Sequence, residues 1–396
     1  MNNNNFCILS DKFQRVTSKN NIGNTNVLTI SAQHGLINQF EYYNHQYASE
    51  NTSGYTLLHK GDFAYNKSYS DGYPWGATKR LERYDSGVVS PLYICFSAKD
   101  GVYADFYSYY FESEPFYRKI YKIAQEGARN HGLLNVSTED FFKIQIANPP
   151  LEEQRRIADI LGCCDRVIAL KKELIAEKKK QKKALMQKLL NPDSGFRLPG
   201  FSGEWKKFKI SEICKIESGG TPATGDEQCW NGDIFWCTPS DITNAGKYIS
   251  HTPQKITQKG IDTSSATLLP TGSVIMCSRA SIGPRCITQV PMATNQGFKN
   301  FICSDLLYNE FWYYFIDTIL EDLYKMASGN TFKEVSKNSI ATYLVTIPSN
   351  IAEQQAIADI LSAADKEIDL LEQELAQQEQ KKKSLMQLLL TGIVRV

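Results

Sequence analysis

Two polar loops carry the side chains of this chain that are best suited to bind another molecule. Arg and Lys can contact phosphates or guanine edges, and Asn and Gln can pair with adenine. Each loop follows a predicted β-strand and combines such cations with hydroxyl or amide groups, and the first loop adds aromatic rings. Ordinary solvated loops are the alternative interpretation. We predict nucleic-acid contacts from Asn66, Lys67, Ser68, Tyr73, Trp75, Lys79 and Arg80 in the first loop, and from Ser278, Arg279, Ser281, Arg285, Asn295 and Gln296 in and after the second.

The turn Gly329–Lys333 is a further candidate for nucleic-acid contact. Its Thr331 and Lys333 carry hydroxyl and ammonium groups of the kind that contact phosphate. A plain connection between a helix and a strand explains the same residues equally well, so both interpretations stay open.

The motifs that resemble catalytic or phosphate-binding sites each lack a required residue. Asn148-Pro149-Pro150 resembles a motif whose amide holds an extruded adenine, but Leu151 stands where an aromatic ring would stack on the base. Gly220–Gly225 has the outer glycines of a phosphate-binding loop, but acidic residues follow where Lys and Ser/Thr are required. The five histidines do not have metal-ligand spacing. We therefore expect no catalytic residue, no metal and no cofactor in this chain.

A duplicated segment shows how the elements that carry these loops are arranged. Residues 151–190 recur at 351–390 without a gap, with about 18 identities in 40 positions. Pro149-Pro150 and Pro348 precede the two copies, and Pro192 and Gly392 follow them, as expected at the ends of helices. We predict two long helices, here called the first and second arms, each following a larger globular segment, or head.

Apolar residues in both arms are separated alternately by three and four positions, which predicts the seam of a coiled coil. Lys in the first arm, and Gln and Lys in the second, interrupt the seam, which can restrict the choice and alignment of a partner. Solvated surface helices are the alternative interpretation. The expected interface consists of Leu161, Ile168, Ile175, Leu185 and Leu189 in the first arm and Leu361, Ile368, Leu371, Leu375, Leu385 and Leu389 in the second.

The charge of the two arms is opposite, although the formal net charge of the chain is only +1. The first arm has 11 Lys or Arg against 6 Asp or Glu, and the second has 4 Lys against 8 Asp or Glu. We therefore expect the arms to lie side by side and to select each other by charge.

The heads follow one order of elements and are predicted to be α+β units. Each has a β-like run (Asn26–Ser31, Ile234–Ser240), then a second strand (Lys60–Lys67, Thr271–Ser278), a polar loop and an aromatic helix (Phe106–Ile123, Glu310–Met326). The predicted domains are head one at 1–150, the first arm at 151–195, head two at 196–350 and the second arm at 351–391.

The composition fits this organisation. A chain of 396 residues suits about two domains with connecting elements. The ten cysteines have no C-x-x-C pair, which indicates reduced thiols. We find neither a signal-like amino terminus nor an apolar run long enough to span a bilayer, so we expect a cytoplasmic protein with no membrane partner.

Three features together resemble one known family. These are Leu198-Pro199-Gly200-Phe201-Ser202-Gly203-Glu204-Trp205 at the start of the second head, the turn Ser328–Ser336 near its end, and the paired Glu-Gln-x-x-Ile-Ala-Asp-Ile-Leu segments of the arms. The combination closely resembles the specificity subunit of type I restriction-modification enzymes, over nearly the whole chain.

The resemblance implies a non-catalytic subunit that directs the activity of others. Each head would be a target-recognition domain for one half of a bipartite, asymmetric site in double-stranded DNA. The arms would pair as an antiparallel coiled coil, set the spacer between the half-sites and dock two methyltransferase (modification) subunits, which motor-nuclease (restriction) subunits then join. S-adenosylmethionine, Mg²⁺ and ATP would be used by these partners.

One departure from the family pattern concerns the start of the first head. It has no counterpart of Gly203-Glu204-Trp205-Lys206-Lys207, which suggests a truncated or divergent edge and a looser closure between the ends of the two repeats. Two other functions stay open: a self-contained adenine methyltransferase, which would bind a methyl donor, and a coiled-coil adaptor that does not bind DNA.

Overall fold

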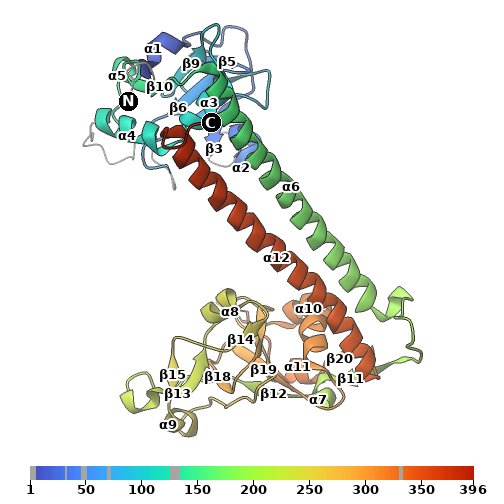
Figure 1. Ribbon diagram of the computed structural model, residues 1–396. Helices are drawn as coiled ribbons and strands as arrows, with labels where there is room; N and C mark the ends of the chain where they lie inside the picture. The colour runs from blue at the N-terminus through green and yellow to red at the C-terminus, as the bar shows by residue number, and fades with distance from the viewer. Residues whose placement is uncertain (1–5, 32–33, 46–50, 69–72, 125–133, 330–332) are drawn as a thin grey trace. The chain divides into compact units, whose positions relative to one another are not determined.

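The computed structural model describes residues 6–31, 34–45, 51–68, 73–124, 134–329 and 333–396. It divides into two compact units, one formed by residues 1–172 with 373–396 and the other by residues 173–372. Each unit contains one head and a part of both long helices, α6 (Leu151–Leu189) and α12 (Ile351–Leu390) (Figure 1). The arms therefore belong to the units and are not separate from them. The domain boundaries at 150, 195 and 350 stay a prediction.

The first head mixes short strands with short helices, as an α+β unit does. Its main sheet has the antiparallel order β2-β9-β6-β7, and three two-stranded ladders, β1-β10, β3-β4 and β5-β8, surround it. Its elements are β1 (Phe6–Ile8), α1 (Leu9–Lys12), β2 (Phe13–Arg15), β3 (Leu28–Ser31), β4 (Gly35–Asn38), α2 (Gln39–Tyr43), β5 (Thr56–His59), β6 (Phe63–Asn66), β7 (Ala77–Arg80), β8 (Ser86–Val89), β9 (Ile94–Ala98), α3 (Ala104–Tyr110), α4 (Glu114–Ile123), α5 (Thr138–Phe142) and β10 (Gln145–Ala147).

The second head repeats this plan and adds strands to it. Its main sheet has the order β12-β19-β16-β17-β14, beside a ladder β11-β20 and a three-stranded sheet β15-β13-β18. Its elements are β11 (Trp205–Lys209), α7 (Ile210–Ile213), β12 (Cys214–Ser218), η3 (Glu227–Cys229), β13 (Trp230–Cys237), α8 (Pro239–Ala245), β14 (Tyr248–Ile249), β15 (Lys255–Ile256), α9 (Gln258–Asp262), β16 (Val274–Cys277), β17 (Arg285–Thr288), β18 (Met292–Thr294), β19 (Phe298–Cys303), α10 (Asn309–Met326), α11 (Lys337–Thr342) and β20 (Leu344–Pro348), after the short η2 (Pro192–Ser194).

The two heads share one register in their main sheets. In the first head Phe63 of β6 lies opposite Phe96 of β9, and in the second Val274 of β16 lies opposite Phe301 of β19. The strand that opens each head pairs antiparallel with the strand that precedes an arm, as β1-β10 and β11-β20. The first head lacks the sequence pattern of Gly203–Lys207, but it still has the edge strand. This strand, β1, has three residues.

The prediction of one long aromatic helix at Phe106–Ile123 is wrong, because this region forms two helices. α3 ends at Tyr110, and α4 begins at Glu114 after its cap residue Ser113. Pro115 lies in the first turn of α4, where its missing N–H does not break a helical hydrogen bond. The corresponding region of the second head, α10, is a single helix of 18 residues.

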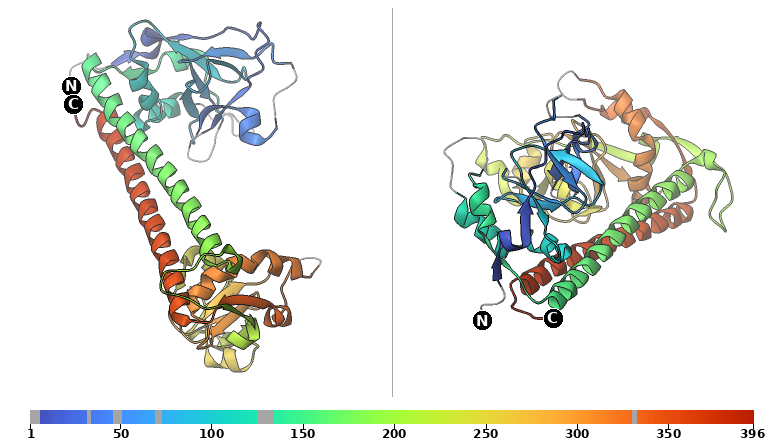
Figure 2. Two further views of the ribbon diagram at one scale, coloured as in Figure 1. Left: turned by 90° about the vertical axis from the view of Figure 1, so that its right-hand side faces the viewer. Right: turned by 90° about the horizontal axis from the view of Figure 1, so that it is seen from above.

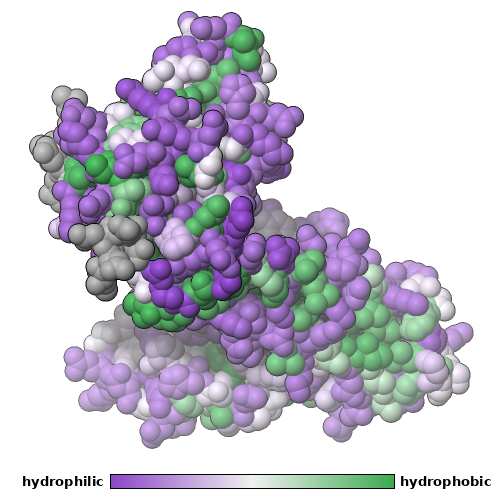
Figure 3. Space-filling view, turned by 45° about the horizontal axis from the view of Figure 1, so that its top comes forward, coloured by the Kyte–Doolittle hydropathy of each residue, from purple (hydrophilic) through white to green (hydrophobic). Residues whose placement is uncertain are grey.

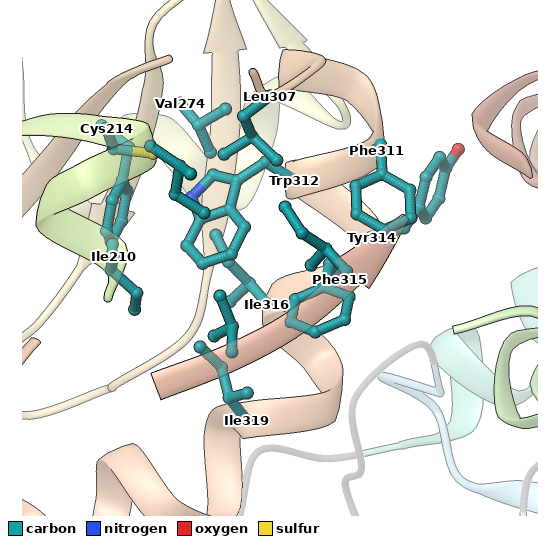
Figure 4. Close-up of a cluster of buried hydrophobic side chains, with 14 of the residues drawn as sticks. Ile210, Cys214, Val274, Leu307, Phe311, Trp312, Tyr314, Phe315, Ile316 and Ile319 are labelled. Atoms are coloured by element: carbon teal, nitrogen blue, oxygen red, sulfur yellow. The ribbon is translucent and has the colours of Figure 1, made fainter. Parts of the chain in front are cut away.

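The ends of the arms complete the apolar core of each unit. In the first unit, Ile157 and Leu161 from the start of α6 and Leu389 and Leu390 from the end of α12 pack among aromatic residues of the head. In the second unit, the start of α12 and the end of α6 do the same around Trp312. Figure 4 shows Trp312 within this second cluster, next to Val274 and Leu307. Because each core takes the start of one arm and the end of the other, the arms run antiparallel, as the family resemblance implies.

The predicted seam residues of the arms lie on their covered side. Lys171, Lys178 and Lys182 interrupt the seam of α6, and each forms an ion pair with an acidic residue of α12. The predicted charge attraction is therefore present, and α6 and α12 lie side by side in both views of Figure 2. Of the predicted interface residues, Leu161, Ile175, Leu189, Leu361, Ile368 and Leu389 are buried, whereas Ile168, Leu185, Leu371, Leu375 and Leu385 are half-buried.

In the face drawn in Figure 3, hydrophilic residues predominate, with smaller apolar patches between them. Among the described residues, no helix combines the length and the apolarity needed to cross a bilayer.

Gly162 lies in the interior of α6, and we predict that Gly162→Ala stabilises the protein. A Cβ atom there would lie 3.5 Å from the Tyr109 hydroxyl and 3.7 Å from Arg166 Nη1, which are ordinary contacts. Because glycine inside a helix costs about 1 kcal/mol relative to alanine, the free energy of unfolding should rise by about that amount. Urea denaturation measures it. The control Gly219→Ala should destabilise, since its Cβ would lie 1.8 Å from Asn295 O. A lower midpoint for Gly162→Ala would contradict the packing described.

Candidate nucleic-acid interface

Three segments of the second head meet where strand β16 ends. The Ser278 amide donates to Gly297 O at 2.8 Å, and the Val335 amide donates to Ser278 O at 3.0 Å. The Ala280 amide donates to Lys333 O at 3.1 Å, and Ala280 itself has a left-handed φ of 63°. The backbone therefore brings together the predicted residues of the polar loop, those at 295–296 and the described part of the predicted turn.

Four of the predicted residues of this head are exposed at that junction. Arg279, Ser281, Gln296 and Lys333 have solvent-accessible side chains. The Lys333 ammonium lies 4.6 Å from the ring centroid of Tyr324, which leaves its charge at the surface. Together these side chains offer cations, a hydroxyl and an amide over a small area. Thr331 lies outside the described residues.

The other predicted residues of the second head make contacts inside the protein. Ser278 is buried, and its hydroxyl donates to Gly297 O at 3.1 Å. Asn295 accepts a hydrogen bond from the Gly297 amide at 2.9 Å. Arg285 forms an ion pair with Asp317 at 2.7 Å and donates to Tyr313 O at 2.5 Å, and its side chain is 7% exposed. These contacts hold the loops in place. Arg285 could contact a ligand only if its side chain left Asp317 and Tyr313 O.

An ion pair between the buried Lys299 and the partly exposed Glu334, at the same junction, was not predicted from the sequence. The Lys299 ammonium is 3.0 Å from Glu334 Oε1 and 3.4 Å from the Ser278 hydroxyl, and its side chain is 5% exposed. The pair links β19 to the segment that bears Lys333. A lysine within the largely apolar strand Phe298–Cys303 is the sequence signal that points to it.

The loop Gly219–Thr221 packs against the same junction. The Gly220 amide donates to Thr294 O at 2.8 Å, and Gly220 O accepts from the indole N–H of Trp236 at 2.9 Å. The Thr221 hydroxyl donates to the amide oxygen of Gln296. Gly219 and Gly220 thus allow a close backbone approach. The phosphate-loop pattern in the sequence contained Gly220 and Gly225.

The first head places its predicted residues at the end of the equivalent strand, β6. Asn66 is half-buried and accepts from the Ser68 amide at 3.0 Å. The Lys67 ammonium donates to Val136 O at 3.0 Å, and burial, together with the charge of Arg15, lowers the pKa of Lys67. Lys67 therefore anchors the loop to the segment before α5. Residues 69–72 of this loop lie outside the described residues.

The remaining cations of the first loop are also paired within the head. Lys79 is buried and forms an ion pair with Glu112 at 2.7 Å, and Arg80 contacts Asp105 at 2.5 Å. The aromatic residues Tyr73 and Trp75 are half-buried. Trp75 stacks edge-on against Tyr121 with ring centroids 4.6 Å apart, and Tyr73 lies 6.3 Å from Tyr117. Of the predicted residues of the first head, Lys79 is buried and the others are half-buried.

The Asn148-Pro149-Pro150 motif is part of a helix start. Gln154 donates to Pro149 O at 2.8 Å, and in the other unit Gln354 donates to Pro348 O at the same distance. In both units a glutamine in the first turn of the arm thus donates to a proline carbonyl just before the helix, which supports the interpretation as punctuation. Within the ranges that the structure describes, His, Cys, Asp and Glu do not form any group of three placed to hold a metal ion, and the ten cysteines are free thiols.

Comparison with known proteins assigns the chain to a family. A family model described as the type I restriction modification DNA specificity domain matches residues 18–179 and again residues 202–380. The chain belongs to this family. The family resemblance predicted from the sequence is therefore confirmed, and each match covers most of one head and most of the arm that follows it.

Two curated relatives from Methanocaldococcus jannaschii are similar to this member of the family. The MjaIX type I restriction enzyme specificity subunit is 37% identical over 179 residues, which are 44% of this chain and 40% of that subunit. The MjaVIII specificity subunit is 26% identical over 331 residues, which are 78% of this chain and 75% of that subunit. The chain thus spans less than half the length of the first relative and three quarters of the second.

Solved structures share the fold along nearly the whole chain. A chain from work on complex assembly and conformational transition of the type I R-M system has a TM-score of 0.62 at 17% identity, with 97% of both chains covered. The HsdS subunit from Thermoanaerobacter tengcongensis has a TM-score of 0.52 at 18% identity, with 98% of this chain and 97% of that one covered. The two-headed α+β architecture with two long helices is therefore that of specificity subunits.

We predict that Arg285→Ala destabilises the second head. The substitution leaves Asp317 without its cation and removes the donor to Tyr313 O from a buried position. The loss should be about 1–2 kcal/mol, because the Arg285 side chain is buried, whereas Asp317 is 40% exposed and stays solvated after the substitution. Urea denaturation of the full chain measures it, with the exposed Ser281→Ala as the control that should stay within about 0.5 kcal/mol. Equal stability of the two variants would show that Arg285 does not support the fold.

Proposed function

We propose that this chain is the DNA sequence-recognition subunit of a type I restriction-modification complex. Each head would read one half of a bipartite, asymmetric site in double-stranded DNA, and partner subunits would carry out adenine methylation and restriction. The observation that carries this proposal is the double match to a DNA specificity domain, once for each head with its arm. The fold shared with specificity subunits supports it.

The surfaces of the two heads support different half-sites. At equivalent strand ends, the second head offers Arg279, Gln296 and Lys333, whereas the first offers Trp75 and Tyr73. Base edges are distinguished by hydrogen-bond donors, acceptors and apolar contacts, so these different sets would select different sequences. A non-palindromic site follows from this difference.

The proposed partners carry the chemistry. We infer that two modification subunits dock to the arms and that motor-nuclease subunits join them, with S-adenosylmethionine, Mg²⁺ and ATP bound by those subunits. The arms support a measuring role, because each is one uninterrupted helix of 39 or 40 residues. At about 1.5 Å per residue this corresponds to roughly 60 Å of helix.

Mapping of methylated adenines across the host genome, with and without this gene, tests the proposal. We expect methylation of one bipartite motif to disappear when the gene is deleted and to return when it is restored. The motif would reveal both half-sites and the spacer. An unchanged methylation pattern in a host that expresses the complex would contradict the proposal, and binding of a methyl donor by the isolated chain would favour a self-contained methyltransferase instead.

We predict that Arg279→Ala relaxes or weakens recognition of one half-site. Loss of a cation that contacts a guanine edge should cost about 1–3 kcal/mol of discrimination at that position. Methylation of oligonucleotides that carry single changes in either half-site measures this. The matched variant Tyr73→Ala in the first head should affect the other half-site. Equal losses at both half-sites from either variant would contradict independent heads.

A further inference from the structure

A Tyr–Asp–Lys triad joins the head of the first unit to both arms. The hydroxyl of Tyr109, in α3 of the head, donates to Asp165 Oδ2 of α6 at 2.9 Å. The Lys382 ammonium of α12 lies 2.6 Å from the other carboxylate oxygen, Asp165 Oδ1, and 5.4 Å from the Tyr109 ring centroid. One carboxylate thus holds the head and the opposite arm at the same time.

The second unit contains the same triad from equivalent positions. The Tyr314 hydroxyl donates to Asp365 Oδ2 at 2.6 Å, and the Lys182 ammonium contacts Asp365 Oδ1 while lying 5.4 Å from the Tyr314 ring centroid. Figure 4 shows Tyr314 at the edge of the apolar cluster, with its hydroxyl oxygen pointing away from the other labelled side chains. The atoms used are the same in both triads, although the arm that supplies Asp in one unit supplies Lys in the other.

The lysines of both triads lie at positions of the coiled-coil seam that are usually apolar. Lys182 and Lys382 occupy seam positions, where apolar residues would pack best, and only about a quarter of each side chain is exposed. Burial and the neighbouring carboxylate raise the pKa of both tyrosines, so their hydroxyls remain donors at physiological pH. A slip of the arms by one heptad, about 10 Å, would separate Asp from Lys in both triads at once.

We propose that the two triads are positioning devices that fix each head on the arms and thereby restrict the spacer length of the DNA site. This inference rests on the proposed function of the chain. One added base pair moves a half-site by about 3.4 Å and rotates it by about a tenth of a turn. A head held by a charge-assisted bond to both arms resists that displacement, whereas a head held by apolar contacts alone tolerates it better.

The first triad offers the sharper test, because the second has additional support. In the second unit the Lys247 ammonium contacts Ser362 of α12 at 2.6 Å and Glu310 at 2.9 Å, which adds another polar link between head and arm. In the first unit Gly162 stands at the position equivalent to Ser362 and has no side chain to make such a link.

The experiment uses the Tyr109→Phe variant in the assembled complex with its modification subunits. Methylation is measured on a DNA library with both half-sites fixed and the spacer varied by one or two base pairs. Tyr109→Phe keeps the ring and removes the bond to Asp165. Because a hydrogen bond to a charged group contributes about 1.5–3 kcal/mol, methylation at neighbouring spacer lengths should rise about tenfold relative to the preferred length, with both half-sites unchanged.

Two control variants remove the same kind of bond inside a head. Tyr84→Phe removes a 3.0 Å bond to Glu41, and Tyr343→Phe removes a 2.6 Å bond to Asp322. Both should leave the spacer preference unchanged, so a general loss of stability would not mimic the predicted effect. The variant Asp165→Asn, which removes the charge that Lys382 requires, should broaden the spacer preference in the same way as Tyr109→Phe.

The outcomes separate this inference from the proposed function. If the unaltered complex methylates a bipartite site and Tyr109→Phe and Asp165→Asn keep its spacer preference, the role of the triads is wrong while the proposed function stands. If the controls broaden the spacer preference as much as Tyr109→Phe does, the role of the triads is also wrong. If the unaltered complex shows no bipartite specificity at all, the proposed function fails and this inference fails with it.

Discussion

The apolar core of each unit requires the start of one arm and the end of the other. Ile157 and Leu161 enter the first core beside Leu389 and Leu390, and each buried aliphatic side chain contributes about 2 kcal/mol. The four interarm ion pairs at Lys171, Lys172, Lys178 and Lys179 lie near the surface and contribute about 0.2–1 kcal/mol each. Burial therefore forces the antiparallel arrangement, and the charges select its register. Neither head has a complete core without the arms.

Each unit has one ion pair between an arginine that follows one arm and a glutamate at the start of the other. The Arg197–Glu353 pair at 2.6 Å joins the segment after the first arm to the start of the second, and Arg395–Glu153 at 2.7 Å makes the equivalent link in the other unit. Both glutamates are buried. The sequence suggested a looser closure between the ends of the two repeats at the first head. The Arg395–Glu153 pair in that unit is nevertheless equivalent to Arg197–Glu353 in the other. Similar frameworks then carry different loops, which is how one chain would present two different reading surfaces.

The sequence predicted the features that depend on repetition and periodicity. The duplicated Glu-Gln-x-x-Ile-Ala-Asp-Ile-Leu segment located both arms, and the three-four spacing located their covered side. The sequence did not predict which cations are exposed, because the exposure of each cation depends on neighbours that are distant in the chain. Lys79 pairs with Glu112, Arg80 with Asp105 and Arg285 with Asp317, so loop composition alone overestimated the number of free cations. The ion pair of the buried Lys299 with Glu334 is not predictable from the sequence for the same reason.

In the proposed function, each head recognises one half-site and the length of the arms sets the spacer between them. The most direct test is to lengthen both arms together. One heptad would be inserted between Lys171 and Lys178 of α6 and one between Glu367 and Glu374 of α12, which leaves both head cores and the charge register intact. Seven residues add about 10 Å, or about three base pairs of DNA. Mapping of methylated adenines should show the same two half-sites with a spacer about three base pairs longer. Both half-sites read at the original spacing would contradict the account.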